Sequence, residues 1–348
     1  MSGTKIKKIT GPWNLKNAYF PKDRGKVFSC FSYCGGSTMG YKLAGFDVIG
    51  CNEIDPKVIE VYKLNHKPRH SFNCSIREML KIDLPEDLYN LDILDGSPPC
   101  TSFSTAGVRE RDWGKEKKFS EGQAHQRLDD LFFEFIALAK KLQPRFIVAE
   151  NVTGIVKGKA RGYIKEIMKA YFDAGYITQI FRLNAANMGV PQARERIFFI
   201  SKRRDIQRKK ITLSFSEKVI SFDMASSWVD KPSDKEDLKL SPCLLRFYDK
   251  TRKGFTMATV HPKGSFFSKK RLSEKKPCRT ITAATKDLMH PTEKRHLSLN
   301  EYLILSSFPM DMNWKDWHNH KAKWAMGMSV PPFMMQRIAI EIYEQWIK

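Results

Sequence analysis

The sequence predicts an α/β fold, a doubly wound and mainly parallel sheet joined to a smaller, irregular second domain. Short β-prone runs alternate with helical patterns as far as Ser201, which is typical of a parallel sheet covered by helices. Glycine or polar residues follow the ends of these runs. Beyond Ser201 the alternation stops, and the chain becomes irregular and rich in lysine, serine and proline.

The elements follow from local patterns. We expect strands at residues 26–31, 46–51, 91–94, 145–149, 176–183 and 196–201. Helices are expected after the glycine-containing turn at 33–40, and at 55–64, 128–142, 163–174 and 331–347. Asp55 followed by Pro56 predicts an N-cap and a first helical turn. Residues 1–203 and 311–348 should form the larger domain, and residues 204–310 the smaller one.

Ligands of doubly wound sheets bind at the carboxyl ends of the strands. Gly35, Glu53, Pro99, Cys100 and Glu150 follow strand ends in the sequence. We therefore expect these five residues to face one crevice.

Composition narrows the class of protein. The chain has 348 residues, 42% of them hydrophobic and 28% charged, which indicates a globular protein. Its formal net charge of +22 favours a nucleic acid partner, although a solubilising surface is the alternative. No apolar run is long enough to span a bilayer, and the basic N-terminus lacks a signal-peptide pattern. We expect a cytoplasmic protein without membrane contact.

The seven cysteines are an odd number without a signal peptide, which argues against a disulfide framework. No C-x-x-C pair occurs, so no metal site is expected. Most of these thiols should be buried.

Two basic clusters occur in the irregular part. One lies at 202–210, and the other, at 263–276, is interleaved with Phe266 and Phe267. Both fit a nucleic acid surface, and solvated loops are the alternative.

Several motifs indicate chemistry. The close pair Gly35-Gly36, with Glu53 after the next strand, is typical of a nucleotide cofactor site. NAD, FAD and S-adenosylmethionine all fit, although the incomplete glycine spacing favours a cofactor without a pyrophosphate. Pro98 and Pro99 stiffen the approach to Cys100, which is placed for nucleophilic attack or, alternatively, is a buried structural thiol.

Two further motifs lie on the neighbouring strands. Glu150 could share a proton with a ring nitrogen of a substrate, or could instead cap a helix or form a salt bridge. Gln192, Arg194 and Arg196 alternate into a strand and so share a side, where the arginines suit carbonyl or phosphate oxygens or an ion pair with Glu195.

In this combination the chain resembles the cytosine-C5 DNA methyltransferases of restriction-modification type over nearly its whole length. The matching blocks, in order, are residues 31–36, Asn52-Glu53, Pro98-Pro99-Cys100, Glu150-Asn151-Val152, 183–185, 192–196, 295–298 with Phe308-Pro309, and 327–330. Each block is short, but their order and spacing together are highly specific.

The resemblance implies a fold of the S-adenosylmethionine-dependent methyltransferase type, with the larger domain catalytic and the smaller one recognising the target. It implies catalytic roles for Cys100, Glu150, Arg194 and Arg196, and substrate contacts for Ser104, Asn151 and Gln192. Cofactor contacts are implied at Phe31, Gly35, Gly36, Glu53, Ile54, Ile76, Pro99, Leu131, Ser329 and Val330. The expected reaction transfers methyl to C5 of a cytosine flipped out of duplex DNA, leaves S-adenosylhomocysteine, and is carried out by a monomer.

The chain departs from the family at three places. Tyr33 stands where glycine is common, Met328 replaces an asparagine, and no acid is evident at 73–75. Residues 101–127 are expected to form a loop that closes over the base, and a surface loop without this role is the alternative. A tRNA cytosine-C5 methyltransferase and a catalytically dead DNA-binding relative are the alternatives, and a nicotinamide dehydrogenase is a more distant one. The recognised DNA site does not follow from the sequence.

Overall fold

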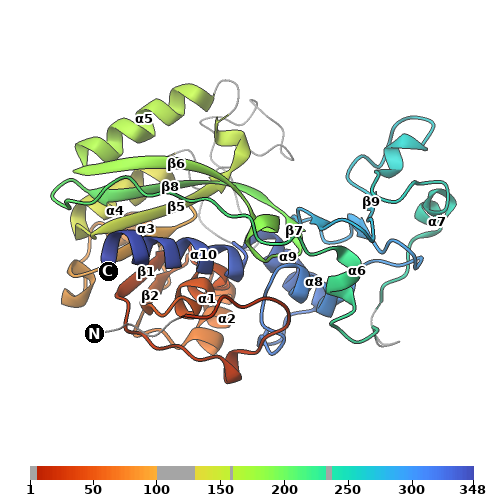
Figure 1. Ribbon diagram of the computed structural model, residues 1–348, viewed down its shortest axis with the longest axis horizontal. Helices are drawn as coiled ribbons and strands as arrows, with labels where there is room; N and C mark the ends of the chain where they lie inside the picture. Colours follow the sequence, from red (N-terminus) through yellow and green to blue (C-terminus); the bar gives the residue numbers. More distant parts are fainter. Residues whose placement is uncertain (1–5, 100–129, 157–159, 233–236) are drawn as a thin grey trace.

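The computed structural model describes residues 6–99, 130–156, 160–232 and 237–348. A seven-stranded sheet in the order β3-β2-β1-β4-β5-β8-β6 forms its centre, and helices cover both faces (Figure 1). The strands are β1 (Lys26–Cys30), β2 (Asp47–Asn52), β3 (His70–Phe72), β4 (Ile93–Gly96), β5 (Phe146–Val152), β6 (Tyr176–Asn184) and β8 (Glu195–Arg203).

The pairing confirms the predicted doubly wound, mainly parallel sheet. β1 lies between β2 and β4 and is parallel to both, and β4 is parallel to β5. Strand β8 runs antiparallel to its two neighbours, β5 and β6. The carboxyl ends of β1, β2, β4 and β5 therefore lie at one edge, as expected for a ligand crevice.

Alternate residues of each central strand enter different cores. Val27 of β1 and Val148 of β5 pack on one face, whereas Phe28 and Ile147 pack on the other. The first face is covered by α1 (Gly36–Leu43), α2 (Pro56–His66) and α10 (Pro332–Ile342), and the second by α3 (Ile76–Met79), α4 (Leu131–Leu142) and α5 (Ala160–Asp173). Both faces are buried, so the strands read as nearly continuous apolar runs.

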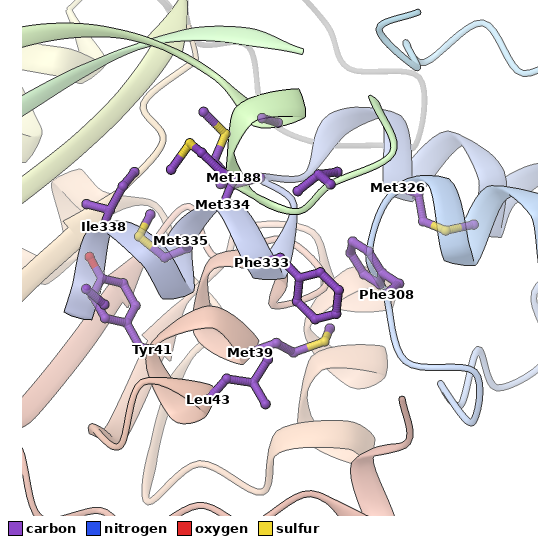
Figure 2. Packing of buried hydrophobic residues seen from close by; sticks show 14 of the residues in the cluster. Met39, Tyr41, Leu43, Met188, Phe308, Met326, Phe333, Met334, Met335 and Ile338 are labelled. Carbon is purple, nitrogen blue, oxygen red and sulfur yellow. The ribbon is translucent and has the colours of Figure 1, made fainter. Parts of the chain in front are cut away.

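The C-terminal helix α10 completes the large core. Figure 2 shows Met335 and Ile338 of α10 beside Tyr41 of α1. A Cβ atom on Gly40 would lie 2.5 Å from Cβ of Met335, so this glycine permits the close approach of the two helices.

The segment after β8 consists of short elements at the right of Figure 1. They are α6 (Phe222–Ser226), α7 (Pro242–Tyr248), β9 (Lys270–Arg271), β10 (Cys278–Arg279), β11 (Leu288–Met289), α8 (Leu299–Leu305) and α9 (Asn319–Met328). Ile211 and Phe222 pack into the main core, whereas Leu244, Tyr248 and Met289 belong to a small separate cluster. The division into domains at 204 and 310 stays a prediction.

Most predicted elements are confirmed, including Asp55 as the N-cap of α2, where its side chain accepts from the backbone N–H groups of Lys57 and Val58. Several boundaries differ by a few residues. β4 spans Ile93–Gly96 rather than 91–94, and β5 continues through Glu150 and Asn151, because β8 pairs with it as far as Val152. Within the described ranges, no helix has the length and apolar character needed to cross a bilayer.

Candidate active site

The turn after β1 has an unusual backbone. Phe31 and Tyr33 both have a φ of 50°, and Gly35 has a φ of 83°. A Cβ atom on Gly35 would also lie 2.0 Å from Nε2 of His66, so only glycine fits there. Tyr33 occupies a left-handed position without being glycine, and its ring packs edge-on against Trp324 of α9, with 5.3 Å between the centroids.

Gly36, the next residue that the sequence singled out, lies against the chain that precedes α10. A Cβ atom at this position would lie 2.3 Å from the carbonyl oxygen of Val330. The start of α1 therefore needs glycine in order to meet residues 329–330, which are about three hundred positions away along the chain.

A pocket opens at this junction. Its described lining residues are Ser29, Phe31, Ser32, Tyr33, Gly36, Ser37, Asp95, Ser97, Met328, Ser329 and Val330. The structure thus brings together four of the predicted cofactor contacts, which are Phe31, Gly36, Ser329 and Val330. Met328, one of the departures from the family pattern, also faces the pocket and is half exposed.

Glu53 lies directly beside the pocket. Its carboxylate accepts the backbone N–H of Tyr33 and that of Asp55, each at 3.0 Å. Burial raises the pKa of Glu53 to about 7, although these hydrogen bonds lower it. Asn73, in the region that lacks the family's acid, donates to the backbone carbonyls of Glu53 and Ile54.

Asp95 is a buried acid that sequence reasoning missed. It lies in β4, where its carboxylate accepts the hydroxyl of Ser29 at 2.8 Å and that of Tyr41 at 3.3 Å. Burial raises the pKa of Asp95 to about 7. An acid within an otherwise apolar strand, next to the Gly-Ser-Pro-Pro stretch, was the available signal.

The turn that follows β4 is held by a residue of β5. Asn151 donates through Nδ2 to the carbonyl oxygen of Pro98 at 3.2 Å, and its own Oδ1 accepts the N–H of Val152. This contact fixes the backbone two residues before Cys100. Cys100 itself, Ser104 and the predicted closing loop at 101–127 lie outside the described residues.

Glu150 and Arg196 form an ion pair between β5 and β8. Nε of Arg196 lies 2.8 Å from Oε1 of Glu150, and both side chains are largely buried. The pair fixes the carboxyl group of Glu150 in β5, one residue before Asn151, and it places a guanidinium beside that carboxyl group.

The side chains of Gln192 and Arg194, by contrast, form hydrogen bonds with backbone groups. The amide of Gln192 donates to the carbonyl of Leu305 and accepts the N–H of Ile281. Arg194 is 2% exposed, and its Nη1 donates to the carbonyls of Ile281 and Gly327 at 2.8 and 3.0 Å. Burial lowers the pKa of Arg194. The two side chains clamp residues 278–282 and α9 to the sheet domain.

The described lining does not include the predicted cofactor contacts Gly35, Ile54, Ile76, Pro99 and Leu131. Ile76 and Leu131 are buried in the core on the opposite face of the sheet, against which Phe31 packs. Ile54 and Pro99 are partly exposed near the carboxyl edge and are absent from the described lining.

A second, more polar cavity lies between Lys42, Asp47 and His66. It opens near the amino end of β2, away from the predicted catalytic residues. In the described ranges, no group of three His, Cys, Asp or Glu side chains could hold a metal ion.

Comparison with known proteins shows which family the chain matches. Residues 25–344 match the family model of the C-5 cytosine-specific DNA methylases. The chain is 34% identical over 218 residues to Type II methyltransferase M.NgoPII of Neisseria gonorrhoeae, and 33% identical over 231 residues to Type II methyltransferase M.FnuDI of Fusobacterium nucleatum. These alignments cover 62% and 64% of this chain, but only 55% and 62% of the two relatives.

A solved structure shares the fold. It is that of a protein encoded within an E. coli prophage and described as a DNA modification methyltransferase. It superposes with a TM-score of 0.64 and 20% identity, over 92% of this chain and 99% of that one. With the family model matching nearly the whole length, the chain belongs to the C-5 cytosine-specific DNA methylase family.

Proposed function

We propose that this protein is a DNA (cytosine-5-)-methyltransferase that uses S-adenosylmethionine as methyl donor and Cys100 as a covalent nucleophile. The observation that carries the proposal is the Glu150–Arg196 pair at 2.8 Å, next to the turn that leads to Cys100. β4, which precedes that turn, also contributes to the pocket beside Gly36. This pair and this pocket lie at the edge of the sheet from which the chain continues toward Cys100, which supports the proposal.

The pocket suits the donor. Where Gly36 meets Val330, backbone forms two sides of the pocket, and Phe31 provides an apolar wall. Glu53 lies at the end of β2, where an acid suits ribose hydroxyls, and its oxygens can accept further hydrogen bonds. Phe31, Tyr33, Glu53, Ser329 and Val330 would hold the cofactor. When bound, S-adenosylmethionine supplies an electrophilic methyl group.

The chain's residues would make C5 of cytosine nucleophilic. The thiolate of Cys100 adds to C6, forming an S–C6 bond and placing the ring's electron pair at C5, the carbon that is methylated. C5 then loses its proton to a base, the C5–C6 double bond re-forms, and the C6–S bond breaks. Cys100 is thereby regenerated.

Glu150 and Arg196 would manage charge during the addition. A proton shared between Glu150 and N3 of cytosine stabilises the negative charge that the ring acquires. Arg196, held by Glu150, presents a guanidinium that suits the O2 carbonyl. The base must leave the duplex for these contacts to form.

Double-stranded DNA is the proposed substrate. The net charge of +22 favours a polyanion, and Lys270 and Arg279 lie near each other in the region predicted to recognise the target. We also propose that a single monomer binds both the cofactor and the DNA.

The test is transfer of tritiated methyl to duplex DNA and, in parallel, to tRNA. We expect transfer to DNA, and bisulfite sequencing of DNA from expressing cells identifies the methylated site. Transfer to tRNA alone would contradict the proposal.

A second experiment tests the nucleophile. Cys100→Ala should bind DNA but transfer no methyl, and 5-fluorocytosine DNA should trap a covalent complex with the wild type only. Cys243→Ala, at an exposed cysteine of α7, is the matched control and should retain activity. Turnover by Cys100→Ala would refute the assigned role.

A further inference from the structure

Asp95 is a carboxylate buried without a cation. It is 3% exposed, and its hydrogen-bond partners are the neutral hydroxyls of Ser29 and Tyr41. Over the described ranges, no lysine, arginine or histidine forms an ion pair with it. A buried ionised carboxylate costs several kcal/mol unless it is paired, so this arrangement needs an explanation.

The position of Asp95 supplies one. It lines the same pocket as Phe31, Gly36 and Val330, where the donor is proposed to bind. The wall around it is rich in hydroxyl groups, those of Ser29, Ser37 and Ser97. This end of the pocket is therefore polar and negatively charged, whereas Phe31 makes part of the wall apolar.

We infer that Asp95 binds the α-ammonium group of the methionine part of S-adenosylmethionine. The inference rests on the proposed function, because it takes the pocket as the donor site. An ammonium group has three N–H donors, which match one carboxylate and the surrounding hydroxyls. The sulfonium group has no hydrogen to donate, so a hydroxyl-lined acid suits it less well.

Burial without a cation agrees with this role. Burial, together with the smaller effect of the negative charge of Glu150, raises the pKa of Asp95 to about 7, although the hydroxyls of Ser29, Ser37 and Tyr41 lower it. A bound ammonium group would favour the ionised form and restore the missing counter-charge. Asp95 is then a binding residue, which holds the donor at the sheet edge beside the catalytic turn.

The experiment compares three probes by isothermal titration calorimetry at pH 7.5. S-adenosylmethionine has both cations, S-adenosylhomocysteine has only the ammonium group, and 5′-methylthioadenosine has neither. Asp95→Asn keeps the size and the hydrogen-bonding capacity of the side chain and removes its charge. Tyr41→Phe removes one hydrogen-bond partner and keeps the charge, so it is the matched control.

We expect Asp95→Asn to weaken binding of the first two probes about 10- to 100-fold and to leave 5′-methylthioadenosine within about twofold. Tyr41→Phe should change all three little. Weakening of S-adenosylmethionine alone would assign Asp95 to the sulfonium and overturn the inference. Equally weakened binding of all three probes would show that Asp95 has a structural role, and unchanged binding would show that it does not contact the donor. Either result would overturn the inference.

The wild type gives an independent readout if Asp95→Asn does not fold. Between pH 8 and pH 6, protonation of Asp95 should weaken the binding of S-adenosylhomocysteine more than the binding of 5′-methylthioadenosine. Glu53 and Glu150 also lie near the pocket. Glu53 is proposed to contact the ribose, which both probes carry, so its titration should affect both alike. The difference between the two pH profiles therefore reports binding of the amino-acid part of S-adenosylhomocysteine. Parallel pH profiles would overturn the inference. A wild type that binds none of the probes would refute the proposed cofactor as well.

Discussion

Replacing Arg194 by methionine separates a structural role from a substrate-binding one. The change keeps a long side chain but removes both donors to the carbonyls of Ile281 and Gly327. Hydrogen bonds from a charged group to buried partners contribute about 1.5–3 kcal/mol each, so the loss is about 3–6 kcal/mol. With an unfolding entropy of about 2.1 cal/mol/K per residue for 348 residues, the melting temperature should fall by about 4–8 °C.

Differential scanning calorimetry measures this change, and a matched control lies nearby. Arg182→Met removes an exposed ion pair with Glu195 and should lower stability by less than about 1 kcal/mol. The clamp also predicts that Arg194→Met weakens S-adenosylmethionine binding, because Gly327 leads into the pocket residues 328–330. An unchanged melting temperature together with a raised KM for DNA would refute the clamp and favour direct contact with the substrate.

Four further predictions test the site. Glu150→Gln should lower single-turnover methyl transfer by about 10²–10⁴-fold with DNA binding nearly unchanged, and an unaltered rate would contradict its acid role. Gly36→Ala should lower both the melting temperature and the affinity for the donor, because the new Cβ atom would lie 2.3 Å from the carbonyl oxygen of Val330. Gly162→Ala is the control and should be neutral or stabilising, because its Cβ atom would meet nothing within 4 Å. Lys270→Gln should reduce the slope of log affinity for duplex DNA against log salt by about 1 in fluorescence anisotropy, and an unchanged slope would exclude a phosphate contact. Because burial raises the pKa of Asp95 to about 7, the folded protein keeps a proton that the unfolded chain loses above about pH 4, and the stability of the ligand-free protein falls as pH rises between these values. Asp95→Asn should therefore stabilise the ligand-free protein more at pH 8 than at pH 4 in urea melts. An equal gain at both pH values would contradict the raised pKa.

Local signals in the sequence predicted local structure well. Asp55 with the following proline fixed the start of α2, and alternating β-prone and helical runs identified six of the seven strands of the main sheet. Strand β3 was missed because three residues are too few to show a period. The short α3 was missed for the same reason, although its capping box of Ser75 and Glu78 was a usable signal.

Long-range contacts could not be predicted from one sequence. Arg194 appeared suited to substrate oxygens, but its described partners are carbonyls 87 and 133 positions away. Asp95 similarly finds Ser29 at a separation of 66 positions, because β1 and β4 are neighbours only in the folded sheet. A motif predicts which residue types gather at the edge, but burial and partners decide which of them face the ligand.

These contacts also couple the two ligand sites that we propose. Arg194 holds Ile281, which follows the pairing of β10 with the short strand β7 (Gln192–Ala193), and it holds Gly327, which precedes the pocket wall. Gly327 is packed so tightly that a Cβ atom there would lie 2.2 Å from the carbonyl oxygen of Thr282. Residues 278–282 and 327–330 therefore cannot shift independently, since one guanidinium and one backbone contact join them. If DNA displaced residues 278–282, this clamp would transmit the displacement to residues 327–330 in the wall of the proposed donor pocket.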